Sequence, residues 1–326
     1  QKEWTITNGI GGFASSTIIG ANTRKYHGLL IAPFDPPADR HLILAKVDES
    51  LEIDGHKYDL YTNMNKNYIS DGYKYQESFE KQYFPIFTYK IKNVKITKTI
   101  SMEYGKNTVA IQYKIKNGDS KAILTLAPLI NFRNYHHTST NSKFDLSQEI
   151  EDTKLTITVN KRSDRPIYIS VPDSKYIIHN DNSFNDMFYI EEEKRGFIAE
   201  ENHAIPGVFE IVINPNEEKE ISFICSLEKE IEEKTAKEII EKEIERLDKI
   251  IKETKLIEKK SEQNQDLIKK LIIASDNFVA YKPAFDLHTV MAGYPWFIDW
   301  SRDTLISFEG LLLVTRRYEI AREVLL

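Results

Sequence analysis

The sequence is poor in cysteine: Cys225 is the only one among 326 residues. A single cysteine cannot form a disulfide within the chain, which excludes a small fold held together by disulfides. Cys225 ends the apolar run 221–225, which predicts a strand, and a thiol in that setting is a small buried hydrophobic group rather than a nucleophile. The fold must therefore depend on a hydrophobic core, which a chain of this length can build in about two domains.

Three further absences narrow the range of functions. No apolar run approaches the ~20 residues that span a bilayer, so we expect no membrane partner. The net charge is −6, acidic and basic residues are interspersed and no basic face stands out, which argues against nucleic acid. The N-terminal residues 1–4 lack a signal-peptide pattern, and we expect a cytoplasmic protein. The missing initiator methionine suggests that the natural chain begins earlier.

Residues 1–225 show the period-2 alternation that is typical of strands. Val109, Ile111, Tyr113 and Ile115 alternate with more polar residues, and a turn follows at 117–118. Other predicted strands are 88–92, 95–102, 123–130, 155–159, 167–171, 209–213 and 221–225. Turn-forming residues separate these runs, and helical periodicity is nearly absent. The pattern predicts a large antiparallel β-sandwich over residues 1–225, without a helix longer than two turns.

The periodicity becomes helical after this region. Residues 226–258 are dense in Glu and Lys, and Ile240, Ile244, Leu247 and Ile251 form one apolar stripe at helical spacing. We interpret the segment as a linker helix that begins near Ser226 and lies on the globular body. A partner-binding coil is the alternative.

Residues 259–326 predict the start of a helical domain. One helix carries a wider apolar stripe that includes Leu267 and Leu271, another runs to about Thr315, and a third restarts at Tyr318. These helices cannot bury the leucines at 311–313 and a tryptophan-rich loop among themselves. We therefore expect that a larger helical domain continues past this chain, which would make the chain a fragment.

The segment Gly293-Tyr-Pro-Trp-Phe-Ile-Asp-Trp-Ser-Arg-Asp-Thr304 has the most informative chemistry. Glycine and proline keep its first part out of regular structure, and helical spacing begins at its end. The aromatic and charged residues therefore lie on a loop that leads into a helix. Aromatic faces pack on the apolar face of a pyranose, while Asp and Arg hydrogen-bond its hydroxyls. The loop is therefore predicted to bind sugar.

A structural interpretation of this loop stays open beside the sugar-binding one. Asp303 is a candidate N-cap of the following helix. Arg302 is a candidate partner of Asp299 in an ion pair, and Trp296 and Trp300 are candidate core residues.

The loop resembles the glucose-binding loop of the glucoamylase-like (α/α)6 glycosidases. It is most similar to that of the archaeal and bacterial glycogen debranching enzymes, the amylo-α-1,6-glucosidase family. Three further segments are family-like: 8–30, 131–137 and 188–196. Ser301 is a departure, since the family usually has glycine there, and its side chain narrows the conformations open to the loop.

The resemblance implies an N-terminal β-supersandwich, a linker helix and the first helices of a truncated (α/α)6 barrel. The implied activity is glycogen debranching by inverting hydrolysis of α-1,6-linked glucose from branched α-glucan, with two carboxyl groups roughly 6.5–9.5 Å apart. The family's general acid and base come from later helix–loop units, so no catalytic residue is assigned and the fragment is expected to be inactive. A glucoamylase or glycoside phosphorylase of the same architecture is an alternative. A non-catalytic glycan-binding or oligomerisation module is an alternative of another class.

The resemblance also implies a set of site residues. Trp300, Arg302 and Asp303 would line the subsite for the non-reducing glucose, and Trp296 and Trp300 would form its wall. Asp303, beside a helix N-terminus, would stay ionised and accept hydrogen bonds from sugar hydroxyls rather than transfer protons. Asp299 is a weaker candidate for a general acid.

Arg24, Tyr26 and His27, in the N-terminal family-like segment, are candidates for interface or accessory contacts. We expect no metal, because no cysteine or carboxylate near the adjacent histidines 136 and 137 completes a usual ligand set. We expect no cofactor either: no Gly-Lys-Ser/Thr follows the glycines at 9, 11 and 12, which favours tight turns over a phosphate loop.

Overall fold

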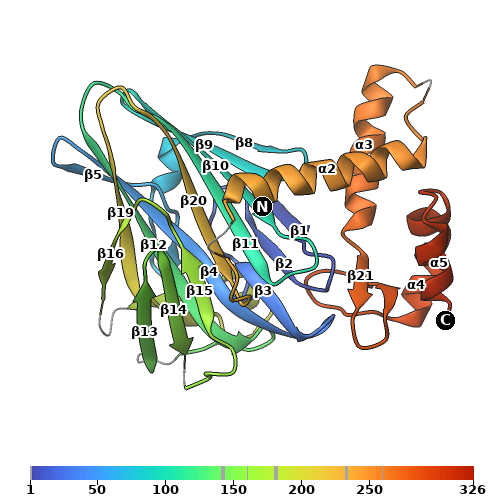
Figure 1. Cartoon of the computed structure of the whole chain (residues 1–326). Helices are drawn as coiled ribbons and strands as arrows, with labels where there is room; N and C mark the ends of the chain where they lie inside the picture. Colours follow the sequence, from blue (N-terminus) through green and yellow to red (C-terminus); the bar gives the residue numbers. More distant parts are fainter. Residues whose placement is uncertain (1, 141–143, 160, 180–182, 232–233, 259) are drawn as a thin grey trace.

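The computed structural model describes residues 2–140, 144–159, 161–179, 183–231, 234–258 and 260–326. Figure 1 shows a large β-sandwich, a long helix lying against it and a smaller, mainly helical C-terminal part at the far end of that helix. The predicted order of elements, a β-rich region followed by helices, is confirmed.

The two longest strands of the first sheet, β4 and β12, lie side by side at its centre. Its main path runs β1-β2-β3-β4-β12-β18-β17; β5 pairs with β4, and β19 links β12 to β16. Within the described residues its strands are β1 (Glu3–Thr7), β2 (Phe13–Thr17), β3 (Gly28–Asp35), β4 (Ala38–Ile53), β5 (His56–Asp59), β12 (Ala122–Asn134), β16 (Lys175–Ile178), β17 (Ser183–Phe188), β18 (Glu200–Ala204) and β19 (Gly207–Ile213).

The second sheet packs face to face with the first. Its order is β13-β14-β15-β20-β11-β10-β9-β8. Its described strands are β8 (Gln76–Lys81), β9 (Pro85–Ile91), β10 (Val94–Met102), β11 (Thr108–Lys116), β13 (Leu146–Glu151), β14 (Lys154–Val159), β15 (Ile167–Ser170) and β20 (Glu218–Ser226). One hydrophobic core joins the two sheets, with side chains such as Leu44 and Leu124 from the first and Ile111 and Phe223 from the second.

Alternation along the strands explains why the sandwich could be predicted. In β10 the side chains of Val94 and Ile96 are buried, while that of Lys95 between them is exposed. Since successive side chains point to opposite faces, the apolar set covers the core. Every predicted strand lies within or next to an observed one. The N-terminal strands β1 to β5 were not predicted. For β3 and β4 the reason is that residues 28–53 are buried almost continuously and show no alternation.

Short elements complete the β-rich region. They are the paired strands β6 (Met64–Asn65) and β7 (Tyr68–Ile69), the 3₁₀ turn η1 (Gly72–Tyr75) and the helix α1 (Ile190–Glu193). No helix among the described residues before 226 exceeds two turns, as predicted. The family-like segment 188–196 contains α1, in which the amides of Glu193 and Lys194 donate back to the carbonyls of residues 189 and 190 and close a helical turn.

The linker helix α2 (Ala236–Thr254) begins ten residues later than predicted. Ser226 ends β20, and the helix starts only where Thr235 and Glu238 form a capping box. The Thr235 hydroxyl accepts from the Glu238 amide at 3.2 Å, and the Glu238 carboxylate accepts from the Thr235 amide at 2.8 Å. Lys255 closes the other end in a left-handed conformation.

The predicted apolar stripe of α2 faces the protein. Ile240, Leu247 and Ile251 are buried, and the N-terminal turn packs on β11 and β20 through Ala236 and Ile239. The helix is therefore a linker lying on the globular body and not an isolated coil.

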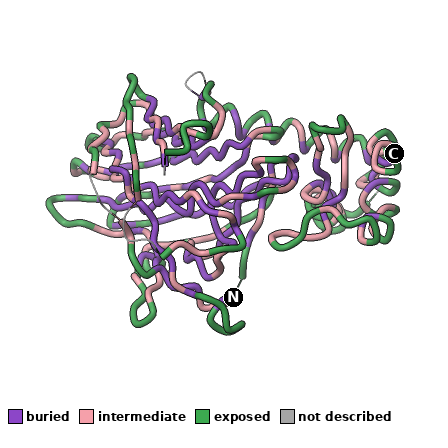
Figure 2. The backbone as a smooth tube through the Cα atoms, turned by 90° about the horizontal axis from the view of Figure 1, so that it is seen from below, coloured by how far each residue is buried: buried purple, intermediate pink, exposed green. Residues whose placement is uncertain are grey.

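The C-terminal part differs from the prediction by one hairpin. Helix α3 (Glu262–Asp276) leads into β21 (Val279–Lys282) and β22 (Leu287–Val290), where only helices and a loop were expected. After the tryptophan-rich loop come α4 (Ser301–Phe308), one π-helical stretch η2 (Glu309–Leu313) and α5 (Tyr318–Val324), which starts where predicted. Leu312 is buried between these elements, but large apolar side chains such as Leu305 and Ile306 stay exposed. Figure 2 shows the contrast between the mostly buried sandwich strands and this more exposed end.

Polar contacts join the C-terminal part to the sandwich. Arg246 of α2 pairs with Asp276 at 2.5 Å, and its guanidinium lies 3.9 Å from the ring of Tyr104, in the loop between β10 and β11. The carbonyl of Gly9 accepts from the amide of Tyr281 at 2.8 Å. Gly9 has a φ of +74°, and a Cβ at this position would clash with the ring of Tyr104. Glycine therefore permits the close approach of residue 9 to the loop between β10 and β11. The predicted domain boundaries at 225 and 258 stay predictions.

Candidate functional site

The tryptophan-rich loop is folded back on itself between β22 and α4. Met291 bridges to Asp299, and the Ala292 amide donates to the Ile298 carbonyl at 2.9 Å. Inside this closure the Phe297 amide donates to the Gly293 carbonyl at 2.8 Å. The loop is therefore ordered by its own backbone.

A buried arginine of the sandwich anchors this loop. The Arg40 guanidinium donates to the carbonyl of Pro295 at 3.1 Å and to that of Phe297 at 3.3 Å. It also lies 4.9 Å from the ring of Tyr294. The hydroxyl of Tyr135 donates to the next carbonyl, that of Trp296, at 3.2 Å. Donors from β4 and from the turn after β12 therefore hold three consecutive carbonyls of the loop, while the side chains of Trp296 and Phe297 stay exposed.

The structure brings Trp296 together with two predicted accessory residues. Its ring meets that of Tyr26 edge to face at 6.2 Å, and the guanidinium of Arg24 lies 5.6 Å from its centroid. A third group, the guanidinium of Arg195, lies 6.0 Å away. Trp296 keeps 37% of its surface exposed, so it is not a core residue. Residues far apart in the sequence thus combine around one indole.

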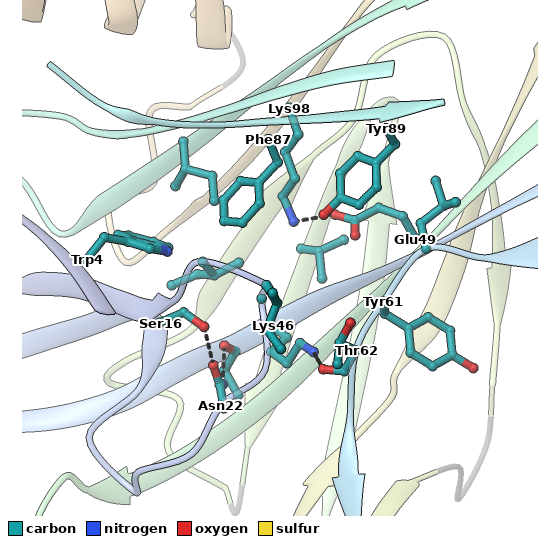
Figure 3. Close-up of a pocket in the computed structure, with 17 residues that line it drawn as sticks. Trp4, Ser16, Asn22, Lys46, Glu49, Tyr61, Thr62, Phe87, Tyr89 and Lys98 are labelled. Atoms are coloured by element: carbon teal, nitrogen blue, oxygen red, sulfur yellow. Dashed lines mark hydrogen bonds and ion pairs between the residues drawn. The ribbon is translucent and has the colours of Figure 1, made fainter. Parts of the chain in front are cut away.

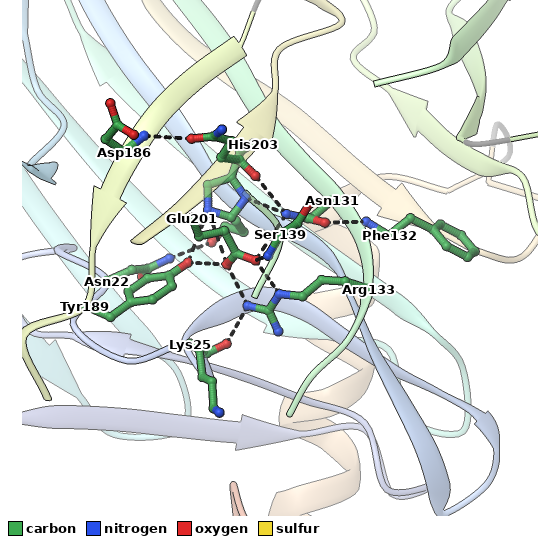
Figure 4. Close-up of polar contacts among 12 residues, drawn as sticks. Asn22, Lys25, Asn131, Phe132, Arg133, Ser139, Asp186, Tyr189, Glu201 and His203 are labelled. Atoms are coloured by element: carbon green, nitrogen blue, oxygen red, sulfur yellow. Dashed lines mark hydrogen bonds and ion pairs between the residues drawn. The ribbon is translucent and has the colours of Figure 1, made fainter. Parts of the chain in front are cut away.

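A buried polar network fixes the segment that carries Arg24 and Tyr26. Arg133 makes a bidentate ion pair with Glu201, with N–O distances of 2.5 and 2.7 Å (Figure 4). It also donates to the Lys25 carbonyl at 2.7 Å. Tyr189 donates to the same carboxylate at 2.5 Å, and His203 contacts the Tyr189 hydroxyl at 3.2 Å. A buried carboxylate with this many donors is well satisfied. The network therefore positions the accessory segment.

His27, the third accessory candidate, lies beneath this surface. Its side chain is fully buried, and Nδ1 accepts from the Thr23 amide at 3.0 Å. Burial lowers the pKa of His27, whereas the closeness of His27, whose Nε2 lies 3.7 Å from the Glu3 carboxylate, lowers the pKa of Glu3 to about 2. Glu3 also pairs with Arg24 at 3.0 Å. His27 is therefore placed to support Arg24 from below, without itself contacting a ligand at the surface.

Trp300, Arg302 and Asp303 lie at the start of α4 with exposed side chains. Trp300 is 52% exposed, and the side chains of Arg302 and Asp303 are 73% and 37% exposed. The N-cap residue is Trp300, and no side chain caps the helix, so Asp303 in the first turn is not the N-cap. Arg302 contacts Asp303 at 3.4 Å and not Asp299. The structural interpretation of these residues is wrong in both respects, and a solvated ion pair is left next to the exposed indole of Trp300.

Asp299 has a structural role. Its carboxylate accepts from Lys282 and from the hydroxyl of Thr289, each at 3.0 Å. Although burial opposes it, this hydrogen bonding keeps the pKa of Asp299 below the usual value. An ionised, paired carboxylate cannot supply a proton as a general acid at neutral pH.

The sandwich also contains a small cavity of about 30 Å³ that both polar and apolar side chains line (Figure 3). Lys98 pairs with Glu49 at 2.5 Å on its wall, and Lys46 donates to the Thr62 carbonyl at 2.7 Å. Such a volume holds about one or two water molecules and no sugar. Within the described ranges no three His, Cys, Asp or Glu side chains cluster as metal ligands, and no helix is long and apolar enough to cross a membrane.

Two family models match the chain. The model described as "Glycogen debranching enzyme N terminal" matches residues 2–220, and that described as "Amylo-alpha-1,6-glucosidase" matches residues 273–326. The first match alone covers more than half of the chain. The chain belongs to the glycogen debranching enzyme family. The family resemblance seen in the sequence is thereby confirmed, and the tryptophan-rich loop falls within the second match.

Solved structures show more distant likenesses to this debranching-family chain. A crystal structure of a bacterial glucoamylase complexed with acarbose aligns with a TM-score of 0.44 and 13% identity, over 100% of this chain and 47% of the other. A kojibiose phosphorylase candidate from the human microbiome aligns with a TM-score of 0.37 and 9% identity, over 83% and 35%. The chain thus spans about half the length of the glucoamylase. No curated protein matches the sequence.

Three residues at the site of this debranching-family chain were not predicted from the sequence. Arg40 and Tyr135 anchor the loop, and Arg195 contacts Trp296. Tyr135 and Arg195 lie in segments that were recognised as family-like, which was the available signal. Arg40 lies in a strand with no motif, and no pattern in the sequence connects it to a loop some 250 residues later.

Proposed function

We propose that this chain forms the glucan-binding part of a glycogen debranching enzyme that hydrolyses α-1,6-linked glucose with inversion. The supporting observation is the loop that Arg40 anchors, which presents Trp296, Trp300, Arg302 and Asp303 to solvent in a chain of this family. Exposed indoles beside a guanidinium and a carboxylate match the two faces of a glucose residue. The substrate in this proposal is a branched α-glucan such as glycogen or a limit dextrin, and the location is the cytoplasm.

Within this proposal the loop residues bind and do not transfer protons. Asp303 accepts from sugar hydroxyls, Arg302 donates to them, and Trp296 and Trp300 form the wall of the subsite. Asp299 is already engaged by Lys282 and Thr289. We therefore expect that the 326-residue chain alone releases little glucose and that a complete amylo-α-1,6-glucosidase domain supplies the acid and base.

The test follows glucose release by NMR, using a protein that carries this chain with a complete glucosidase domain. On a limit dextrin the proposal predicts β-glucose as the first product, because inversion converts an α-linkage into a β-anomer. Linear maltooligosaccharides should react far more slowly. Rapid cleavage of the linear substrate would identify a glucoamylase instead, and phosphate-dependent formation of glucose 1-phosphate would identify a phosphorylase.

A further inference from the structure

A strip of exposed side chains continues from Trp296 onto the β-sandwich. The Arg195 guanidinium lies 6.0 Å from the Trp296 ring and 5.0 Å from the ring of Phe197, so it lies between two aromatic faces. The ammonium group of Lys25 also contacts Phe197, at 5.2 Å from the ring centroid. Phe197 is 50% exposed, and the Arg195 side chain is 42% exposed. We call Trp296, Arg195 and Phe197 the aromatic strip.

Charged groups of both signs surround the aromatic strip. Arg195 lies 3.7 Å from the buried carboxylate of Glu192, and Arg24 pairs with Glu3 at 3.0 Å. Glu191 adds a carboxylate 3.9 Å from Arg24. A polyanion would meet these carboxylates as well as the arginines and Lys25, which disfavours nucleic acid or phosphate as the ligand. Aromatic faces with balanced hydrogen-bonding groups instead suit a neutral, hydroxyl-rich ligand.

The aromatic strip is held in place before any ligand binds. The Glu191 amide donates to the Thr23 carbonyl at 3.0 Å, and the Phe197 amide donates to the Glu192 carbonyl at 3.0 Å. Arg133 holds the Lys25 carbonyl from beneath. These bonds lock α1 and its following turn to the segment that contains Arg24. A preorganised surface loses little conformational entropy on binding, which favours affinity for an extended ligand.

We propose that the aromatic strip binds the α-glucan chain beyond its terminal glucose, so that the β-sandwich itself contributes to substrate binding. The inference rests on the proposed function, because Trp296 belongs both to the glucose subsite and to the strip. In this proposal, a chain whose terminal glucose lies at Trp300 and Asp303 extends past Trp296 toward Arg195 and Phe197. The strip then adds affinity only for ligands long enough to reach it.

The inference is tested by titrating the 326-residue chain and its variants with maltose and with maltoheptaose. Tryptophan fluorescence reports the binding of each sugar. Phe197→Ala should weaken maltoheptaose binding roughly 5- to 10-fold, the loss of one aromatic contact, and leave maltose binding unchanged. Arg195→Met should act in the same direction without removing a ring. The matched control is Tyr68→Ala, which removes an aromatic side chain that is 66% exposed on the separate strand β7.

The variants separate binding at the aromatic strip from binding at the glucose subsite. Equal maltoheptaose affinity in the parent, Phe197→Ala and Tyr68→Ala, with binding lost in Trp300→Ala, would overturn the strip and leave the proposed function standing. No binding of either sugar by the parent would count against both. A change of oligomeric state in Phe197→Ala, seen by sedimentation, would assign the strip to a protein interface and overturn the inference.

Discussion

At the scale of single residues, the candidate site depends on Arg40. Its buried guanidinium joins the sandwich to the loop through two carbonyls and three aromatic rings, those of Phe13, Tyr135 and Tyr294. Methionine fills a similar volume but cannot donate.

Arg40→Met should therefore lower the free energy of unfolding by roughly 1.5–3 kcal/mol, as expected for a buried hydrogen bond from a charged group. It should also weaken maltose binding, because the loop loses its anchor. Denaturant unfolding and the sugar titration measure the two effects. Arg165→Met, at an exposed arginine, is the control and should change neither. Unchanged unfolding in Arg40→Met would show that the loop holds itself in place.

His203 should make the stability depend on pH. Desolvation lowers its pKa to about 4, even though the Glu201 carboxylate opposes that shift. Its contacts suit a neutral ring, with Nδ1 accepting from Asn131 at 3.2 Å and Nε2 donating to Tyr189. Between pH 6.5 and 4 the unfolded chain therefore binds a proton that the folded chain does not, and this favours unfolding as the pH falls.

The expected loss is up to about 1.4 kcal/mol per pH unit within that window. His203→Gln, which keeps an amide in the network, should remove this part of the pH dependence. His56→Gln, at an exposed histidine, should not. Melting temperatures from pH 4 to 7 measure this dependence, and an unchanged slope in His203→Gln would mean that folding does not shift the pKa of His203.

The predictability of the site also differs from residue to residue. The exposed Trp296, Trp300, Arg302 and Asp303 were found from composition and from the family resemblance, because a sugar site requires those residue types close together in the chain. Arg24 and Tyr26 were recognised only as family-like. Their contact with Trp296 depends on how the C-terminal part docks on the sandwich, and no local pattern encodes that arrangement.

At the scale of elements, helix periodicity located α2 but composition misplaced its start. Glu and Lys are frequent from residue 226, yet they do not initiate a helix. The signal that does is Thr235 with Glu238 three residues later, a capping box. The burial of β3 and β4 on both faces explains the other main omission, since a strand that is buried on both faces has no regular apolar–polar alternation to detect.

The contribution of the capping box can be measured by comparing the N-cap of α2, which forms it, with the N-cap of the neighbouring helix α3, which does not. Thr235→Ala removes the cap of α2 and should lower the free energy of unfolding by roughly 0.5–2 kcal/mol. Ser261 is the N-cap residue of α3, but its side chain makes no capping bond, so Ser261→Ala should have almost no effect. Chemical denaturation of both variants checks this difference. Equal losses would mean that residue type alone, and not the bond seen at Thr235, determines the effect.

At the scale of the whole molecule, the sandwich serves as a support for a site on the neighbouring part. The first sheet supplies Arg40 and Tyr135 to the loop backbone, and the buried network of Arg133 and Glu201 holds the segment beside Trp296. The architecture was predictable because alternating and helical periods occupy separate halves of the chain. The docking of the two parts was not, since it depends on contacts such as Gly9 with Tyr281.

The central claim is that the loop at 293–304 binds the terminal glucose of an α-glucan. Asp303→Ala tests it most directly, in a protein that carries this chain with a complete glucosidase domain. Because Asp303 is not the N-cap, the account predicts a loss of stability of no more than about 1 kcal/mol, from the helix dipole alone. It predicts that kcat/KM on a limit dextrin falls about 10²–10³-fold, as when one positioned polar contact is removed. A variant that melts earlier but, while folded, turns over substrate at the normal kcat/KM would contradict the account.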